Sequence, residues 1–156
     1  MNKINLTLGD FLQLENELNG FVDQANNVVI YEGFLKQKLS IILKYELKDT
    51  VKQLVEEKAK VEEVRNELIK QWGEENKELG TLYINTFLEQ KDDEGKVISK
   101  KINPNWVEFD KEMGVLLSKE KELTYPDITI EDLKKAGDTK DDYKVLFKLI
   151  KEESAN

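Results

Sequence analysis

The stretch "DTVKQLVEEKAKVEEVRNELIKQWGEE" (Asp49 to Glu75) decides the expected fold, because it predicts one uninterrupted helix. It contains no proline, and its first glycine is Gly73. An apolar residue recurs every seven positions through this region, which places these residues on one face of a helix. The repeat consists of Leu47, Leu54, Val61 and Leu68. Extended toward the N-terminus, the pattern predicts a helix over 35–72, roughly 55 Å long at 1.5 Å per residue.

Polar residues interrupt this apolar stripe where a coiled coil would carry leucine. Thr50 and Glu57 occupy the companion positions, and Lys58 breaks the seam. The other faces carry Lys and Glu at i, i+4 spacing, which is typical of a solvated, ion-paired surface rather than a catalytic one. We therefore expect the stripe to be buried against a second helix of the same chain, or against a second copy through self-association.

The remaining sequence predicts shorter elements. A helix over 8–18 follows the capping pair Thr7 and Asp10, and a brief extended piece covers 28–31. The alternation after Gly80, with a turn at Gly95, predicts a β-hairpin over 81–102; the alternative extends the long helix through residue 88. Asn103 and Pro104 would start a second helix over 104–122. A short strand and C-terminal helices are expected in 125–152, where Thr129–Asp132 and Thr139–Asp142 resemble capping pairs.

These elements predict a single domain, 1–156, of the α+β class but mainly α. The long helix would pack in an antiparallel helical hairpin with the second helix. A small β-hairpin would lie between them, and the two ends of the chain would form short helices. A two-stranded hairpin alone is marginal in water, so it must pack on a helix or pair with a partner.

Composition excludes several classes of function. The chain has 24 basic and 32 acidic residues, a net charge of −8, and neither His nor Cys. A nucleic-acid partner is not expected, because phosphate binding usually requires a basic field. The carboxylate clusters, 92–95 and 138–142, resemble a hairpin turn and a helix cap rather than a metal site. We expect no catalytic residue, no metal, no cofactor and no small-molecule substrate. The apolar runs are too short for a membrane span, and the first residues do not resemble a signal peptide.

Aromatic residues are the best candidates for binding, because Trp and Tyr are enriched at interaction hot spots. The candidates are Trp72, Tyr83, Phe87, Trp106, Tyr125 and Phe147. The hairpin edge could also accept a strand from a partner. We therefore expect a non-enzymatic protein that works through contacts with another protein.

Three stretches resemble a family of small uncharacterised proteins of tailed bacteriophages. They are "INLTLGDFLQLENELNG", "VEEVRNELIKQWGE" and "YPDITIEDLKKAGDTKDDYKVLFKLI". The resemblance implies a virion or assembly component located in the host cytoplasm or the particle, with a phage structural protein or a host protein as its partner. The alternative is an inhibitor or modulator of a host enzyme or defence system. No functional residues follow from the resemblance.

Overall fold

The computed structural model describes residues 1–135 and 143–150. Within them it has five helices and eight strands, the strands forming four two-stranded antiparallel sheets; 49% of these residues are helical and 27% are in strands. The expected fold, mainly α with one small β-hairpin between two helices, is therefore wrong. The expected capping pair Thr139–Asp142 and the carboxylate cluster 138–142 lie outside the described residues.

The chain divides into two compact units. Unit 1 comprises Met1–Lys58 together with Lys119–Asn156, and unit 2 comprises Ala59–Ser118. The division falls inside the long helix, so both units share one helix. Whether the chain behaves as the single domain we expect stays a prediction.

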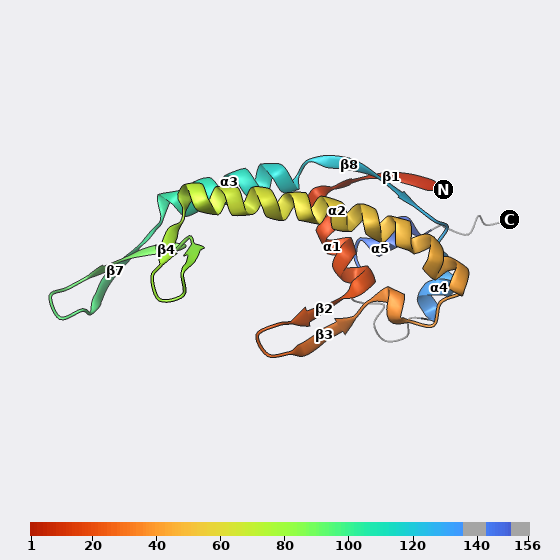
Figure 1. The fold of residues 1–156 in the computed structure, drawn as a ribbon, viewed down its shortest axis with the longest axis horizontal. Helices are drawn as coiled ribbons and strands as arrows, with labels where there is room; N and C mark the ends of the chain where they lie inside the picture. Colours follow the sequence, from red (N-terminus) through yellow and green to blue (C-terminus); the bar gives the residue numbers. More distant parts are fainter. Residues whose placement is uncertain (136–142, 151–156) are drawn as a thin grey trace. The chain divides into compact units, whose positions relative to one another are not determined.

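Unit 1 contains most of the elements, among them strands that the sequence did not predict. In chain order they are β1 (Asn2–Thr7), α1 (Leu8–Asn19), β2 (Gly20–Asp23), β3 (Val28–Glu32), the 3-10 turn η1 (Phe34–Lys36), the first half of α2 (Ile41–Trp72), β8 (Glu120–Tyr125), α4 (Ile130–Lys134) and α5 (Leu146–Leu149). Strands β1 and β8 run side by side (Figure 1), in an antiparallel register from Asn2 opposite Tyr125 to Thr7 opposite Glu120. The expected strand after 125 is only a single bridge between Ile128 and Ile150.

Helix α1 forms the centre of the unit 1 core. Its apolar face is buried at Leu8, Phe11, Leu14 and Leu18. The predicted cap is confirmed, because the backbone N–H of Asp10 donates to Thr7 Oγ1 at 3.1 Å. Of the eighteen buried apolar side chains among the described residues, sixteen belong to unit 1. Unit 1 therefore holds nearly all of the hydrophobic stabilisation.

In unit 1 the polar residues on the buried side of α2 bind strand β8, which the sequence did not predict. The buried positions of α2 alternate in steps of four and three: Leu43, Leu47, Thr50, Leu54, Glu57 and Val61. The polar members find partners on β8, where Thr50 Oγ1 donates to the carbonyl of Thr124 at 3.0 Å and Lys121 pairs with Glu57. The side-chain amide of Gln53 completes the contact, since it donates to the Thr124 carbonyl and accepts from the Thr124 N–H, both at 3.0 Å.

Helix boundaries differ from the predictions for local reasons. Helix α2 begins at Ile41 rather than near 35, because Ser40 Oγ accepts the N–H of Leu43 at 3.1 Å and starts the helix there. Helix α3 (Pro104–Leu117) begins at the predicted Asn103 cap. It does not continue to 122, because residues 120–125 pair with β1. The Thr129–Asp132 capping box is confirmed.

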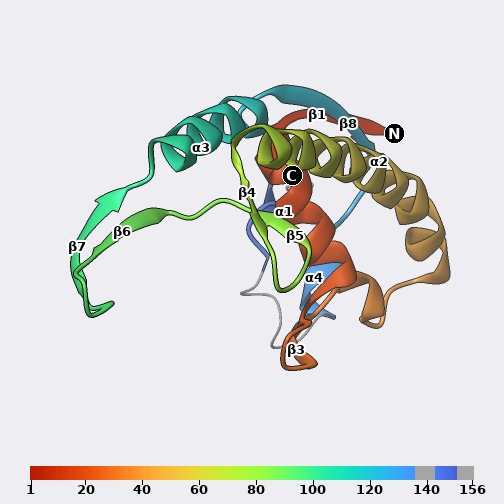
Figure 2. The same cartoon turned by 60° about the vertical axis from the view of Figure 1, so that its left-hand side comes forward.

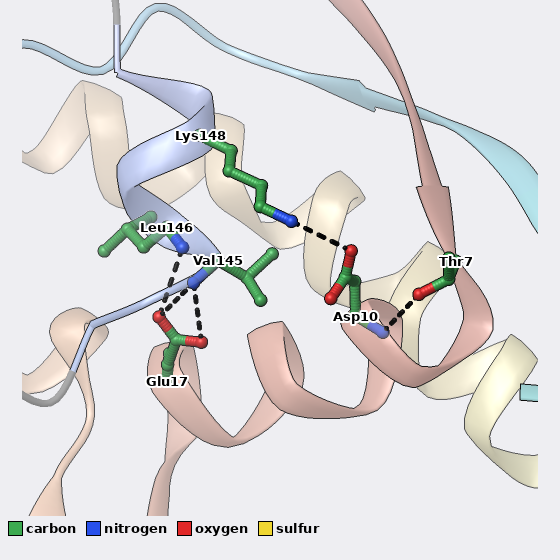
Figure 3. Close-up of polar contacts among 6 residues, drawn as sticks. All are labelled: Thr7, Asp10, Glu17, Val145, Leu146 and Lys148. Atoms are coloured by element: carbon green, nitrogen blue, oxygen red, sulfur yellow. Dashed lines mark hydrogen bonds and ion pairs between the residues drawn. The ribbon is translucent and has the colours of Figure 1, made fainter. Parts of the chain in front are cut away.

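A buried carboxylate joins the first helix to the last. The side chain of Glu17 is fully buried and points at the start of α5 (Figure 3). Its oxygens accept the N–H groups of Val145 at 3.0 and 3.1 Å and of Leu146 at 3.1 Å. Lys148 of α5 also pairs with Asp10 of α1 at 3.2 Å. The negative charge thus satisfies backbone donors that would otherwise be buried without an acceptor.

Unit 2 contains the second half of α2, two hairpins and α3. Strands β4 (Glu74–Asn76) and β5 (Thr81–Tyr83) form one hairpin, and β6 (Phe87–Lys91) and β7 (Val97–Ile102) form the other. The predicted hairpin over 81–102 is therefore partly right: the turn at Gly95 connects β6 and β7, while β5 pairs backward with β4. No helix of the described residues is long and apolar enough to cross a membrane.

Truncation of the buried α2 seam tests its contribution to stability. Leu54 is fully buried, whereas its neighbour Val55 is 45% exposed. Leu54→Ala should lower the free energy of unfolding by about 2–5 kcal/mol, and Val55→Ala by less than about 1 kcal/mol. Urea denaturation followed by circular dichroism measures both values, and equal effects would show that the seam is not buried.

Removal of the buried carboxylate tests the link between α1 and α5. Glu17→Ala should lower the free energy of unfolding by about 1–3 kcal/mol for each N–H group left without an acceptor. Glu56→Ala, which removes an exposed carboxylate from α2, is the matched control and should change stability by less than about 0.5 kcal/mol. Hydrogen exchange at the amides of Val145 and Leu146 should accelerate only in Glu17→Ala; unchanged protection there would contradict the assignment.

Candidate binding site

A groove in unit 2 is a candidate binding site. It has a volume of about 640 Å³ and lies between the last turns of α2, strand β5 and the first turns of α3. Its apolar walls are Ile69, Leu82, Ile84, Trp106 and Phe109. This volume lies within the usual range of ligand-binding clefts.

The charged residues that line the groove are both basic. They are Arg65 and Lys70, on consecutive turns of α2. Arg65 is the only arginine in the sequence. Neither side chain forms a hydrogen bond or ion pair with another residue that the structure describes. Although the chain carries 32 carboxylate side chains, none of the lining residues is Asp or Glu. The groove is thus locally positive on an acidic protein.

Local hydrogen bonds hold α3 at the groove. The buried Asn103 accepts the N–H of Asn105 through its side-chain oxygen at 3.1 Å, which caps α3. Its side-chain nitrogen donates to the carbonyl of Asn85 at 2.8 Å, which ties the cap to the segment that follows β5. One turn further on, the rings of Trp106 and Phe109 lie 5.6 Å apart and tilted by 35°. One asparagine therefore positions the aromatic wall.

The β6–β7 ribbon is the second candidate surface. It projects away from α3 (Figure 2), and every residue of both strands is exposed. Phe87 pairs with Ile102 across the strands, and Val97 and Ile98 follow the turn. Neighbouring residues in a strand point to opposite faces, so both faces of the ribbon carry exposed apolar side chains.

The β2–β3 hairpin of unit 1 also exposes apolar side chains. Val28, Val29 and Ile30 of β3 are about half exposed. The turn that joins β2 to β3 is held by Asp23, whose pKa is lowered because Asn26 donates a hydrogen bond to its carboxylate. This hairpin is a further exposed apolar surface.

The structure brings two of the six predicted interaction residues to the groove, Tyr83 and Trp106. Phe87 is exposed on the ribbon, and Phe147 is exposed on α5 in unit 1. The other two are only partly exposed: Tyr125 at the end of β8, and Trp72 at the end of α2. The indole N–H of Trp72 is buried and has no hydrogen-bond acceptor among the described residues. That any of the six binds a partner stays a prediction.

Sequence reasoning missed the two basic residues of the groove. Arg65 carried a usable signal, because it is the single exception in a chain that otherwise uses lysine for its positive charges. Lys70 had no such signal, since it is one of several lysines of α2.

No protein-family model, curated protein or solved structure matches this chain. Within the described residues there is also no group of three or more Asp or Glu side chains arranged to hold a metal ion.

Two glycines of unit 2 provide a matched test of the groove wall. A Cβ atom on Gly73 would lie 2.4 Å from the carbonyl oxygen of Ile69 and 2.9 Å from that of Tyr83, whereas one on Gly114 would meet no atom within 4 Å. Gly73→Ala should therefore destabilise the protein by about 1–3 kcal/mol and shift the groove walls. Gly114→Ala, inside α3, should stabilise it by up to about 1 kcal/mol. Denaturation measurements of opposite sign support this geometry, and destabilisation by Gly114→Ala contradicts it.

Proposed function

We propose that the chain is a non-enzymatic protein–protein interaction protein and that unit 2 carries its binding surface. One observation supports this most strongly. Unit 2 has sixty residues but only two buried apolar side chains, Val61 and Phe109. Eleven of its apolar side chains are exposed: Val64, Leu79, Leu82, Tyr83, Phe87, Leu88, Val97, Ile98, Ile102, Val107 and Val115.

Such a surface is unfavourable in water unless a partner covers it. A soluble domain of about 60 residues normally buries about 60% of the surface that its unfolded chain exposes. Large exposed apolar patches in soluble proteins are usually interaction sites. The β6–β7 ribbon shows this most clearly, because a two-stranded hairpin without a covering layer is marginal by itself. Contact with a partner would supply the missing apolar burial.

The chemistry of the groove favours binding over catalysis. Its lining has no carboxylate, and the sequence has no His or Cys, so the usual general bases and thiol nucleophiles are missing from it. The resemblance to tailed-phage proteins extends the proposal to a virion or assembly component. An inhibitor or modulator of a host protein is the second form of the same proposal.

Site-specific photo-cross-linking tests the proposed surface. The photoreactive residue p-benzoyl-phenylalanine replaces Ile98, which is 65% exposed on β7, in cells that produce the protein naturally. Irradiation should give a covalent adduct with a discrete protein. Mass spectrometry of that adduct distinguishes a phage structural protein, a host protein and a second copy of the chain.

The control carries the same residue at Lys48, an exposed position of α2 in unit 1. It should give no adduct or a much weaker one. No adduct from Ile98, or equal adducts from both positions, would contradict the assignment of the binding surface to unit 2.

A further inference from the structure

We propose that the groove between α2, β5 and α3 binds a short acidic peptide segment of the partner protein. In this segment an apolar side chain lies next to Asp or Glu residues. The inference rests on the proposed function and adds the chemistry of the bound segment. Its carboxylates would pair with Arg65 and Lys70, and its apolar side chain would lie against Trp106 and Phe109.

Charge complementarity is the first argument. Both charged residues of the groove are basic, and both lack a partner among the described residues. Other lysines of the chain do have carboxylate partners: Lys58 pairs with Glu15 at 3.2 Å, and Lys134 pairs with Glu131 at 3.0 Å. Arginine presents a planar fork of donors that matches a carboxylate in two hydrogen bonds. The groove therefore offers two cations, Arg65 and Lys70, that can bind the carboxylates of a partner.

The aromatic wall is the second argument. Trp106 and Phe109 form a tilted pair, and Ile69 and Leu82 add aliphatic surface. These side chains offer a site for one apolar anchor, and Trp with Arg is a combination enriched at binding hot spots. A volume of about 640 Å³ accommodates a few side chains rather than a folded domain.

The same chemistry also suits a single-stranded nucleic acid, since bases stack on aromatic rings and phosphates bind arginine. The charge of the whole chain decides between the two. At a net charge of −8 the protein repels a polyanion, whose binding requires many phosphate contacts. A short peptide with an acidic residue beside its apolar side chain needs only the two cations of the groove. We therefore assign the groove to a peptide.

Nuclear magnetic resonance titration of the full chain tests the inference. The probe is acetyl-Glu-Asp-Phe-Leu-Glu-Asp-amide. One control peptide carries Lys at the four acidic positions, and another carries Gly-Ser in place of Phe-Leu. The sequence has only two tryptophans, so the Trp106 indole N–H resonance is readily assigned with Trp106→Phe. The acidic apolar probe should shift that resonance saturably, and the shift should weaken as salt is added. Neither control peptide should shift it at the same concentration.

Charge reversal locates the peptide-binding site. Arg65→Glu should weaken binding of the acidic probe by about tenfold or more, because a like charge then faces the peptide carboxylates. Lys111→Glu is the matched control: it makes the same charge change at an exposed position of α3 that does not line the groove, and it should weaken binding by less than about twofold. If Arg65→Glu does not fold, Arg65→Gln provides the same test with a loss of about threefold.

Several results would overturn the groove assignment. These are equal binding of the lysine peptide, equal losses from Arg65→Glu and Lys111→Glu, or no shift with the acidic probe. A shift of the Trp106 resonance by a ten-nucleotide oligothymidylate, without one by the acidic peptide, would assign the groove to nucleic acid instead. A cross-link from Ile98 that persists in any of these cases leaves the proposed function standing.

Discussion

The buried carboxylate of Glu17 is the constraint on which unit 1 depends. A charge without solvent is unfavourable unless donors surround it, and here the donors are the N–H groups of Val145 and Leu146. Each side therefore needs the other: without α5 the carboxylate is buried without a donor, and without the carboxylate two amides lack an acceptor. Because Glu17 belongs to the central helix of the core, this contact, together with the Lys148–Asp10 ion pair, holds α5 against α1. The buried apolar side chains of α1 lie on the same helix as this carboxylate.

Local signals predicted the parts of the fold that depend on local chemistry. The caps at Thr7, Asn103 and Thr129 are present because a side-chain oxygen satisfies free N–H groups wherever a helix starts. The stripe predicted to be buried on α2 is buried at Leu47, Leu54 and Val61, whereas Leu68 is only partly buried. Its polar members, Thr50 and Glu57, interrupt the apolar stripe, and both bind residues of strand β8. Thr50 and the neighbouring Gln53 bind backbone groups of Thr124, which a strand edge offers and a helix surface does not.

The pairing of strands that lie far apart in the chain could not be predicted from the sequence. Strand β1 alternates polar and apolar residues, yet nothing local indicates that its partner lies more than one hundred residues away. The charged run of β8 has a composition typical of a helix, so tertiary pairing overrides its local preference. The groove was unpredictable for the same reason, because α2, β5 and α3 each contribute only part of its lining. Tyr83 and Trp106 were predicted as interaction residues only because they are aromatic. Their position beside Arg65 in one groove depends on the fold and could not be read from the sequence.

Unit 2 is inserted between two parts of unit 1, and both junctions are held by α1. Lys58 pairs with Glu15 just before the insertion, and the carbonyl of Lys119 accepts the N–H of Leu8 just after it. Sixteen of the eighteen buried apolar side chains lie outside the inserted segment. Substitutions within residues 59–118 therefore reach only two of these buried side chains, whereas substitutions in the other described residues act on nearly all of them.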